Sequence, residues 1–258
     1  MMLHQRPQLH ISTRWIGLVV TLALAATAAS ADDGVAPDMV TLLGVRSATV
    51  APNGAAFITF GAASRRDTGA GFVAETDSAL GLGYTIGDAG TGIGLQFGVS
   101  FTGLSQGLGS SGQLSLKAGH LMRGSRVPTF IGVSVEHLAA WGTSSGLPVA
   151  TSAMITWFPT ARIGARTHPM ILSLGYGDHV RNGGTDPGAF VGAGLGLDPN
   201  FGLSAAWTGD SATIGLGYRS ARLPNWRFSG QIDDVFDQNA SRRVTVSATY
   251  LLENAFGG

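Results

Sequence analysis

An imidazole beside a carboxylate is the residue pairing in this chain best suited to acid–base chemistry. It occurs at Asp178-His179, with Asp186 a short distance further along. Consecutive side chains of a β-strand point to opposite faces, so the two groups can act together only if the chain turns there. We interpret Asp178, His179 and Asp186 as solvated polar residues of a loop. We therefore expect no catalytic residues and no enzymatic activity.

Metal and nucleotide sites are not predicted either. Cysteine is absent, which excludes thiolate zinc sites, and the histidines and carboxylates lack metal-ligand spacing. Glycine clusters at Gly92-x-Gly94 and Gly192-x-Gly194-x-Gly196 superficially suggest nucleotide-binding loops. In such a loop the strand ends at the glycines, whereas here an alternation of apolar residues continues through them. We expect no cofactor, interpret these glycines as small residues on one strand face, and expect serine to be tolerated at Gly94.

Composition narrows the class of protein. Among 258 residues, 39 are glycine, 44% are hydrophobic and only 12% are charged, about half the usual charged share of a soluble domain. The formal net charge is zero, so there is no electrostatic case for a nucleic-acid partner. This composition is unlike a disordered tail and unlike a soluble helical enzyme.

The N-terminus indicates export. Arg6 and Arg14 precede or flank an apolar run over Trp15–Ala26, and the chain then reaches Ala29-Ser30-Ala31. A basic region, an apolar run and a small-x-small site are typical of a secretory signal peptide. We predict a signal peptide over residues 1–31 with cleavage after Ala31. An anchor helix is disfavoured because the run is shorter than a span of roughly 20 residues.

A leader over residues 32–52 follows. Asp38 precedes Met39, Leu42, Leu43 and Val45, a spacing that suits one short amphipathic helix capped by Asp38. Such a segment could plug a lumen or lie on the periplasmic side. A loose leader is an equally open alternative.

From about Ala55 onward, apolar residues recur at every second position, which is the period of β-strands. The clearest example runs through Leu95, Phe97 and Val99, with Gly94, Gln96, Gly98 and Ser100 between them. Twelve strands are predicted in this way, centred near Ile58, Gly83, Phe97, Ser115, Val133, Ala153, Leu174, Ala193, Ser204, Gly215, Ser229 and Ala248.

The two faces of these strands predict the architecture. One face is bulky and apolar, and the other is mostly Gly, Ser and Thr, which cannot fill a sandwich core but suit the inside of a barrel that meets lipid outside. Connection lengths mostly alternate between long and short, as in bacterial barrels; residues 159–169 and 209–210 break the pattern. We predict an all-β, antiparallel up-and-down transmembrane barrel of twelve strands over residues 53–258.

The end of the chain carries a resemblance. Val244, Val246, Ala248, Tyr250, Leu252 and Phe256 share one parity. This resembles the C-terminal strand of Gram-negative outer-membrane β-barrel proteins, departing from it in Asn254 and in Gly257-Gly258. The resemblance implies location in the cell outer membrane, contact with its lipid, and the barrel insertion machinery as a partner during assembly.

A few polar or charged residues interrupt the small-residue face, and these are Gln96, Lys117, Glu136, Arg219, Arg227, Asp233 and Glu253. On an up-and-down topology Arg219, Arg227 and Glu253 converge at the periplasmic mouth. Two interpretations stay open: a charge filter for a solute, or ion pairs that brace the wall. The expected function is a passive or weakly selective, porin-like transport channel for small solutes. The alternatives are a non-catalytic structural or adhesive envelope protein and, third, a membrane-embedded hydrolase.

Overall fold

A computed structural model describes residues 39–64, 77–238 and 242–256. The predicted signal peptide, the first residues of the leader and Gly257-Gly258 lie outside the described residues. The strands are β1 (Ala56–Ala63), β2 (Asp77–Ile86), β3 (Gly94–Thr102), β4 (Gly112–Leu121), β5 (Thr129–Trp141), β6 (Ala150–Trp157), β7 (Thr160–Ile163), β8 (Arg166–Arg181), β9 (Asp186–Gly196), β10 (Phe201–Trp207), β11 (Ala212–Ser220), β12 (Leu223–Asp233) and β13 (Arg243–Leu252). Two single-turn 3-10 helices, Leu104–Gln106 and Gly142–Ser144, lie in loops.

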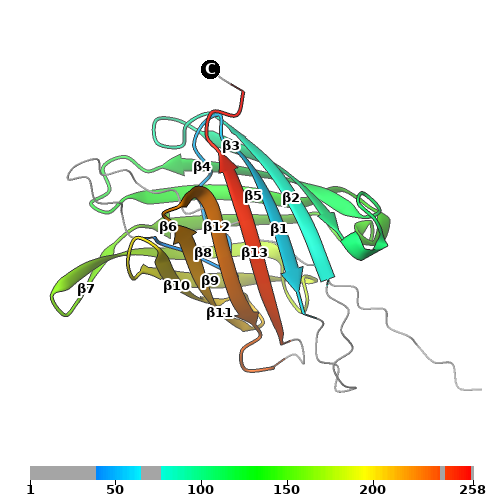
Figure 1. The fold of residues 1–258 in the computed structure, drawn as a ribbon. Coiled ribbons are helices and arrows are strands. Elements are labelled where there is room, and N and C mark those ends of the chain that lie inside the picture. The colour runs from blue at the N-terminus through cyan, green and yellow to red at the C-terminus, as the bar shows by residue number, and fades with distance from the viewer. Residues whose placement is uncertain (1–38, 65–76, 239–241, 257–258) are drawn as a thin grey trace, which may run out of the picture.

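Every strand except β7 belongs to a closed ring, and closure leaves the barrel itself without a sheet edge (Figure 1). Each strand pairs antiparallel with its neighbours, β1 pairs with β13 through Thr59 opposite Thr249, and β6 pairs with β8 through Ile155 opposite Leu174. Without β7 the ring has twelve strands, and each contains one of the twelve predicted centres. The prediction of a twelve-stranded antiparallel barrel is confirmed.

β7 explains the long connection at residues 159–169. Its four residues pair only with the first residues of β8, from Thr160 opposite Pro169 to Ile163 opposite Arg166. The connection is thus a two-stranded hairpin that projects from the barrel (Figure 1). The other exception, at residues 208–211, is a tight turn in which Thr208 N donates to Ser211 O at 2.9 Å.

The two ends of the barrel differ. The connections β2–β3, β4–β5, β6–β8, β9–β10 and β11–β12 lie at one end together with the exit of β13, and we call it the turn end. The remaining connections lie at the other end, which we call the loop end.

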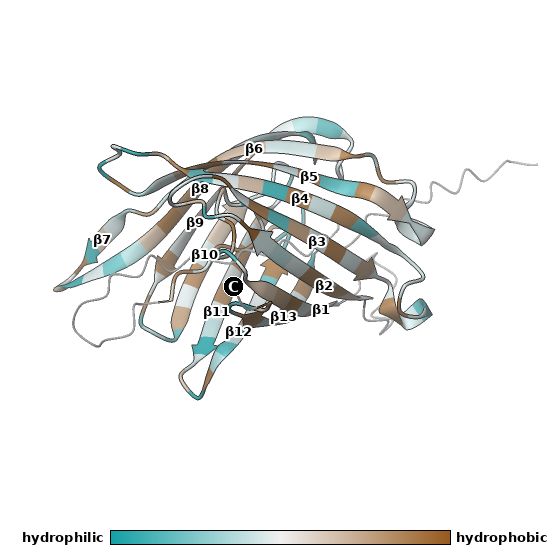
Figure 2. Ribbon diagram, turned by 90° about the horizontal axis from the view of Figure 1, so that it is seen from above, coloured by the Kyte–Doolittle hydropathy of each residue, from teal (hydrophilic) through white to brown (hydrophobic). Residues whose placement is uncertain are grey.

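The outer wall is apolar. Along β10 exposed and buried residues alternate strictly, and Phe97 on β3, facing outward, is 44% exposed. Figure 2 shows hydrophobic and hydrophilic residues alternating along the strands. A row of aromatic rings crosses the outside near the turn end, where Phe201, Tyr218, Phe228, Trp226 and Tyr250 contact one another in turn. The described residues contain no helix long and apolar enough to cross a membrane.

The inside of the barrel holds a stretch of its own chain, residues 39–55, which we call the lumen segment. Leu42 and Ala48 are fully buried there and contribute to the same apolar cluster as Ile171 and Phe190 of the wall. The short amphipathic helix, which the sequence left open beside a loose leader, does not form over residues 39–45. The reason is that wall side chains supply the hydrogen bonds a helix would make internally, as where Leu43 N donates to Ser204 Oγ at 2.8 Å.

Candidate functional site

The lumen segment is an arch with both feet at the turn end. At one foot Met39 N donates to Asp198 O in the β9–β10 connection, at 2.9 Å. At the other foot Gly54 N donates to Thr85 O near the end of β2, also at 2.9 Å. Between them the chain climbs to Gly44, beside Thr213 at the start of β11, and then descends along the opposite wall. The arch therefore crosses the lumen from β9–β11 to β3–β5.

The turn at the top of the arch requires glycine. Gly44 has φ +82°, in the left-handed region, and a Cβ there would lie 2.9 Å from Thr213 Cβ. Both the backbone and the space exclude a larger residue without local rearrangement.

An ion pair fixes the arch just beyond its apex. Arg46 Nε and Nη2 donate to the two carboxylate oxygens of Glu136 on β5, each at 2.6 Å. Both side chains are largely shielded, at 16% and 15% exposure. The Arg46 guanidinium also lies 5.8 Å from the ring centroid of Phe190, and Ser173 Oγ donates to Arg46 O at 2.8 Å. A bidentate pair of this kind fixes orientation as well as charge.

The descending limb is held by two more residues that the sequence singled out. Lys117 Nζ donates to Ser47 O at 3.3 Å. Ala51 N donates to Gln96 Oε1 at 3.1 Å. Gln96, Lys117 and Glu136 thus all face the lumen and all contact the lumen segment.

The glycine clusters allow this close approach. A Cβ on Gly194 would lie 1.9 Å from Thr41 O, and one on Gly119 would lie 2.3 Å from Ala48 O. A Cβ on Gly94 would lie 2.5 Å from Val50 Cγ2. The expectation that serine is tolerated at Gly94 is therefore wrong, because Val50 of the lumen segment occupies the space that the serine side chain would need.

At the turn end Arg219 and Arg227 lie opposite each other on β11 and β12. Arg219 Nε and Nη2 donate to Pro199 O at 3.1 and 2.8 Å. Arg227 Nη1 donates to Trp226 O at 3.0 Å and also to Pro224 O. Glu253 is exposed in the turn after β13, at the same end. The three residues expected to converge at one mouth do lie at one end of the barrel.

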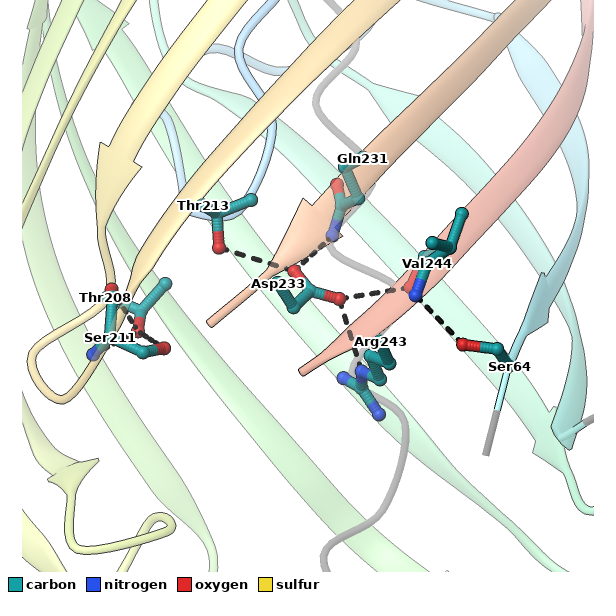
Figure 3. Close-up of polar contacts among 9 residues, drawn as sticks. Ser64, Thr208, Ser211, Thr213, Gln231, Asp233, Arg243 and Val244 are labelled. Atoms are coloured by element: carbon teal, nitrogen blue, oxygen red, sulfur yellow. Dashed lines mark hydrogen bonds and ion pairs between the residues drawn. The ribbon is translucent and has the colours of Figure 1, made fainter. Parts of the chain in front are cut away.

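At the loop end Asp233 is the centre of a polar cluster (Figure 3). Its carboxylate accepts from Gln231 Nε2 at 2.7 Å, Thr245 Oγ1 at 3.0 Å, Arg243 Nε at 3.1 Å and Thr213 Oγ1 at 3.2 Å. The cluster joins β11, β12 and β13, so here the bracing interpretation describes what Asp233 does.

Charge is divided between the two ends. Among the described residues, the turn end carries seven arginines and three carboxylates, a formal net charge of +4. The arginines are Arg123, Arg126, Arg162, Arg166, Arg219, Arg222 and Arg227, and the carboxylates are Asp88, Asp198 and Glu253. Among the side chains that the structure describes at the loop end, there are three arginines (Arg181, Arg242 and Arg243) and six carboxylates (Asp178, Asp186, Asp210, Asp233, Asp234 and Asp237), a formal net charge of −3. Asp88 stays ionised well into acid, because the Gly90 backbone N–H and the Thr91 hydroxyl hold its pKa below the usual value.

Asp178 and His179 lie together, contrary to the expectation from strand alternation. His179 Nδ1 is 2.9 Å from Asp178 Oδ1. The pairing of β8 with β9 shifts register between Gly177 and Arg181, so the regular alternation of side chains ends before this pair. Asp178 Oδ1 also accepts from Thr151 N at 2.7 Å, which ties it to β6. Within the described ranges, no three His, Asp or Glu side chains come together as a metal site would require.

Arg46 is the site residue that sequence reasoning missed. It is the one charged residue between Met39 and Ser64, a mostly apolar and small-residue stretch. A lone charge in such a stretch needs a buried partner, and the inward-facing Glu136 was already identified. Arg46 and Glu136 are 90 residues apart in the sequence, so no local pattern indicates that they pair.

Comparison with known proteins gives similarity of fold. No family model matches the chain, and no curated protein sequence matches it. Among solved structures it is similar to the KdgM porin, with a TM-score of 0.47, 13% identity, and coverage of 75% of this chain and 98% of that one. It is also similar to an outer membrane channel from Pseudomonas putida F1 (0.45, 12%, 79% and 97%) and to the outer membrane protein Omp33 from Acinetobacter baumannii (0.44, 9%, 76% and 97%). At these values the likeness concerns the barrel shape alone.

Proposed function

We propose that this protein is a passive channel for small hydrophilic solutes in an outer membrane. The observation that carries the proposal is the distribution of polarity in the barrel. Its outer surface is apolar and its inner surface carries hydrogen-bonding groups, the reverse of a soluble protein. The closed ring pairs each of its twelve strands with two neighbours, as a bilayer demands of any spanning structure. Bulky outward residues supply the surface that lipid covers.

Aromatic side chains support placement across a membrane. The row of five rings from Phe201 to Tyr250 follows the outside at the turn end. Towards the loop end Phe101 and Trp141 pack edge to face at 5.9 Å, and Tyr176 and Trp207 are exposed on the outer wall. Rings at two heights with aliphatic residues between them are typical of the two membrane–water interfaces. On this placement the turn end is periplasmic.

The lumen segment supports a channel whose opening is restricted by its own chain. Its backbone is bound to the wall by hydroxyl, amide and ammonium side chains, while apolar residues of the segment such as Leu42 pack on an apolar cluster of the wall. The proposal therefore includes the role of this segment as a constriction.

Single-channel recording in planar bilayers tests the function. The intact chain should conduct in small steps, and deletion of residues 39–50 should raise the conductance while the barrel still assembles. Assembly is checked separately by heat-modifiable mobility in gels and by circular dichroism. A correctly assembled barrel that conducts nothing, with or without these residues, would contradict the proposal.

A structural envelope protein is the second candidate, and the same packed lumen segment favours it. A barrel filled by its own chain can serve as an inert wall. The absence of conductance in both recordings is the result that this candidate predicts.

A further inference from the structure

The inward faces of the strands differ in how much solvent reaches them. On β6, β8, β9 and β10 the inward residues are buried, among them Ser152, Ser173, Gly192 and Ser204. The lumen segment covers several of them, since Leu43 N contacts Ser204, Arg46 O contacts Ser173, and Leu42 and Val45 lie against Gly192. These walls offer no free surface to a solute.

β12 differs along its whole length. Its four inward residues, Arg227, Ser229, Gln231 and Asp233, all keep intermediate exposure from the turn end to the loop end. The facing residues of β13, Thr245 and Ser247, are also partly exposed. Accessible side chains therefore form a continuous line on this side of the lumen.

The arch explains the asymmetry. One foot is at Met39, beside β10 and β11, where a Cβ on Gly217 would lie 2.8 Å from Met39 Cε. The other foot packs Ala51 and Ala55 against Phe57 of β1 and Leu251 of β13. At the turn end β12 lies between the two feet of the arch. Arg227 is the inward residue of β12 at this height.

We infer that the water-filled path through the barrel runs along β12, between the lumen segment and the β12–β13 wall. This inference rests on the proposed function and gives it a location. The lining is hydroxyl, amide and ionic, with Ser229 Oγ and Ser247 Oγ 2.7 Å apart at mid-height. It suits small solutes rich in hydrogen-bonding groups, with Arg227 at one mouth and the Asp233 cluster at the other.

Cysteine substitution tests the path, because the chain contains no cysteine of its own. Ser229→Cys lies on the path, and Ser204→Cys is the matched control on a covered wall. Each folded variant is treated with a charged, membrane-impermeant methanethiosulfonate reagent. Modification is measured by mass spectrometry, and conductance is measured before and after treatment.

We expect modification of Ser229→Cys with a loss of conductance, and protection of Ser204→Cys until residues 39–50 are deleted. Equal modification of both variants, or protection of both, would overturn the inference. A barrel in which Ser229→Cys alone is modified, but which never conducts, supports the location of the water-filled side and contradicts the proposed function.

Discussion

Replacing Glu136 by glutamine should loosen the lumen segment without unfolding the barrel. The change removes a carboxylate that accepts two hydrogen bonds of 2.6 Å from Arg46 in a shielded lumen. Breaking one partner of such a pair costs about 3–5 kcal/mol, because the other charge remains buried.

The cost falls on the segment, because the strand ladder that holds the wall together is unchanged. A loss of about 3 kcal/mol raises the population of locally released states by more than about a hundredfold. In planar bilayers the frequency of large opening events should rise accordingly, at the same channel density.

Asp233→Asn is the matched control. Asp233 also forms a shielded lumen ion pair, with Arg243 at 3.1 Å and exposures of 16% and 17%, but its partners belong to the wall. It should leave the frequency of large openings unchanged. The reasoning is refuted if Glu136→Gln opens no more often than the parent protein, or if both variants open equally often.

Three further results are expected. Phe97→Arg should make the free energy of insertion into lipid vesicles less favourable by about 2–4 kcal/mol, because the charge would face lipid at mid-depth. Gln231→Arg, on the lumen face, should insert normally. Equal losses for the two variants would mean that the faces are assigned wrongly. Arg227→Glu should shift the reversal potential measured in a salt gradient towards the value expected for a cation-selective channel. An unchanged reversal potential would show that Arg227 does not line the path. The division of charge between the two ends should make the current–voltage curve asymmetric near 0.1 M salt and nearly symmetric near 1 M, where the screening length falls from about 10 to about 3 Å; a curve symmetric at both concentrations would contradict a role for that charge.

The wall could be predicted from sequence, because a strand with one face in lipid and one in a polar lumen must alternate. The outward position of Leu95, Phe97 and Val99 could be predicted from their alternation alone, because it does not depend on contacts with any other part of the chain. Phe256 also lies outside the barrel, packed on Tyr84 with ring centroids 5.0 Å apart, but it belongs to the turn after β13, so strand alternation does not account for its position.

The contents of the lumen could not be predicted in the same way. Met39, Leu42 and Val45 have helical spacing, yet their partners are distant wall residues such as Gly192 and Gly217, which no local pattern names. The tolerance expected at Gly94 failed for the same reason, since it depends on Val50 across the lumen.

The position of both feet of the arch at the turn end has a topological consequence. A segment that entered one mouth and left by the other would have to be placed while the ring was still open, or be threaded end-first through the closed ring. The lumen segment enters and leaves by the same mouth, at Met39 and Gly54. It can therefore be inserted after β1 has joined β13, and withdrawn again, without the parting of a single strand pair.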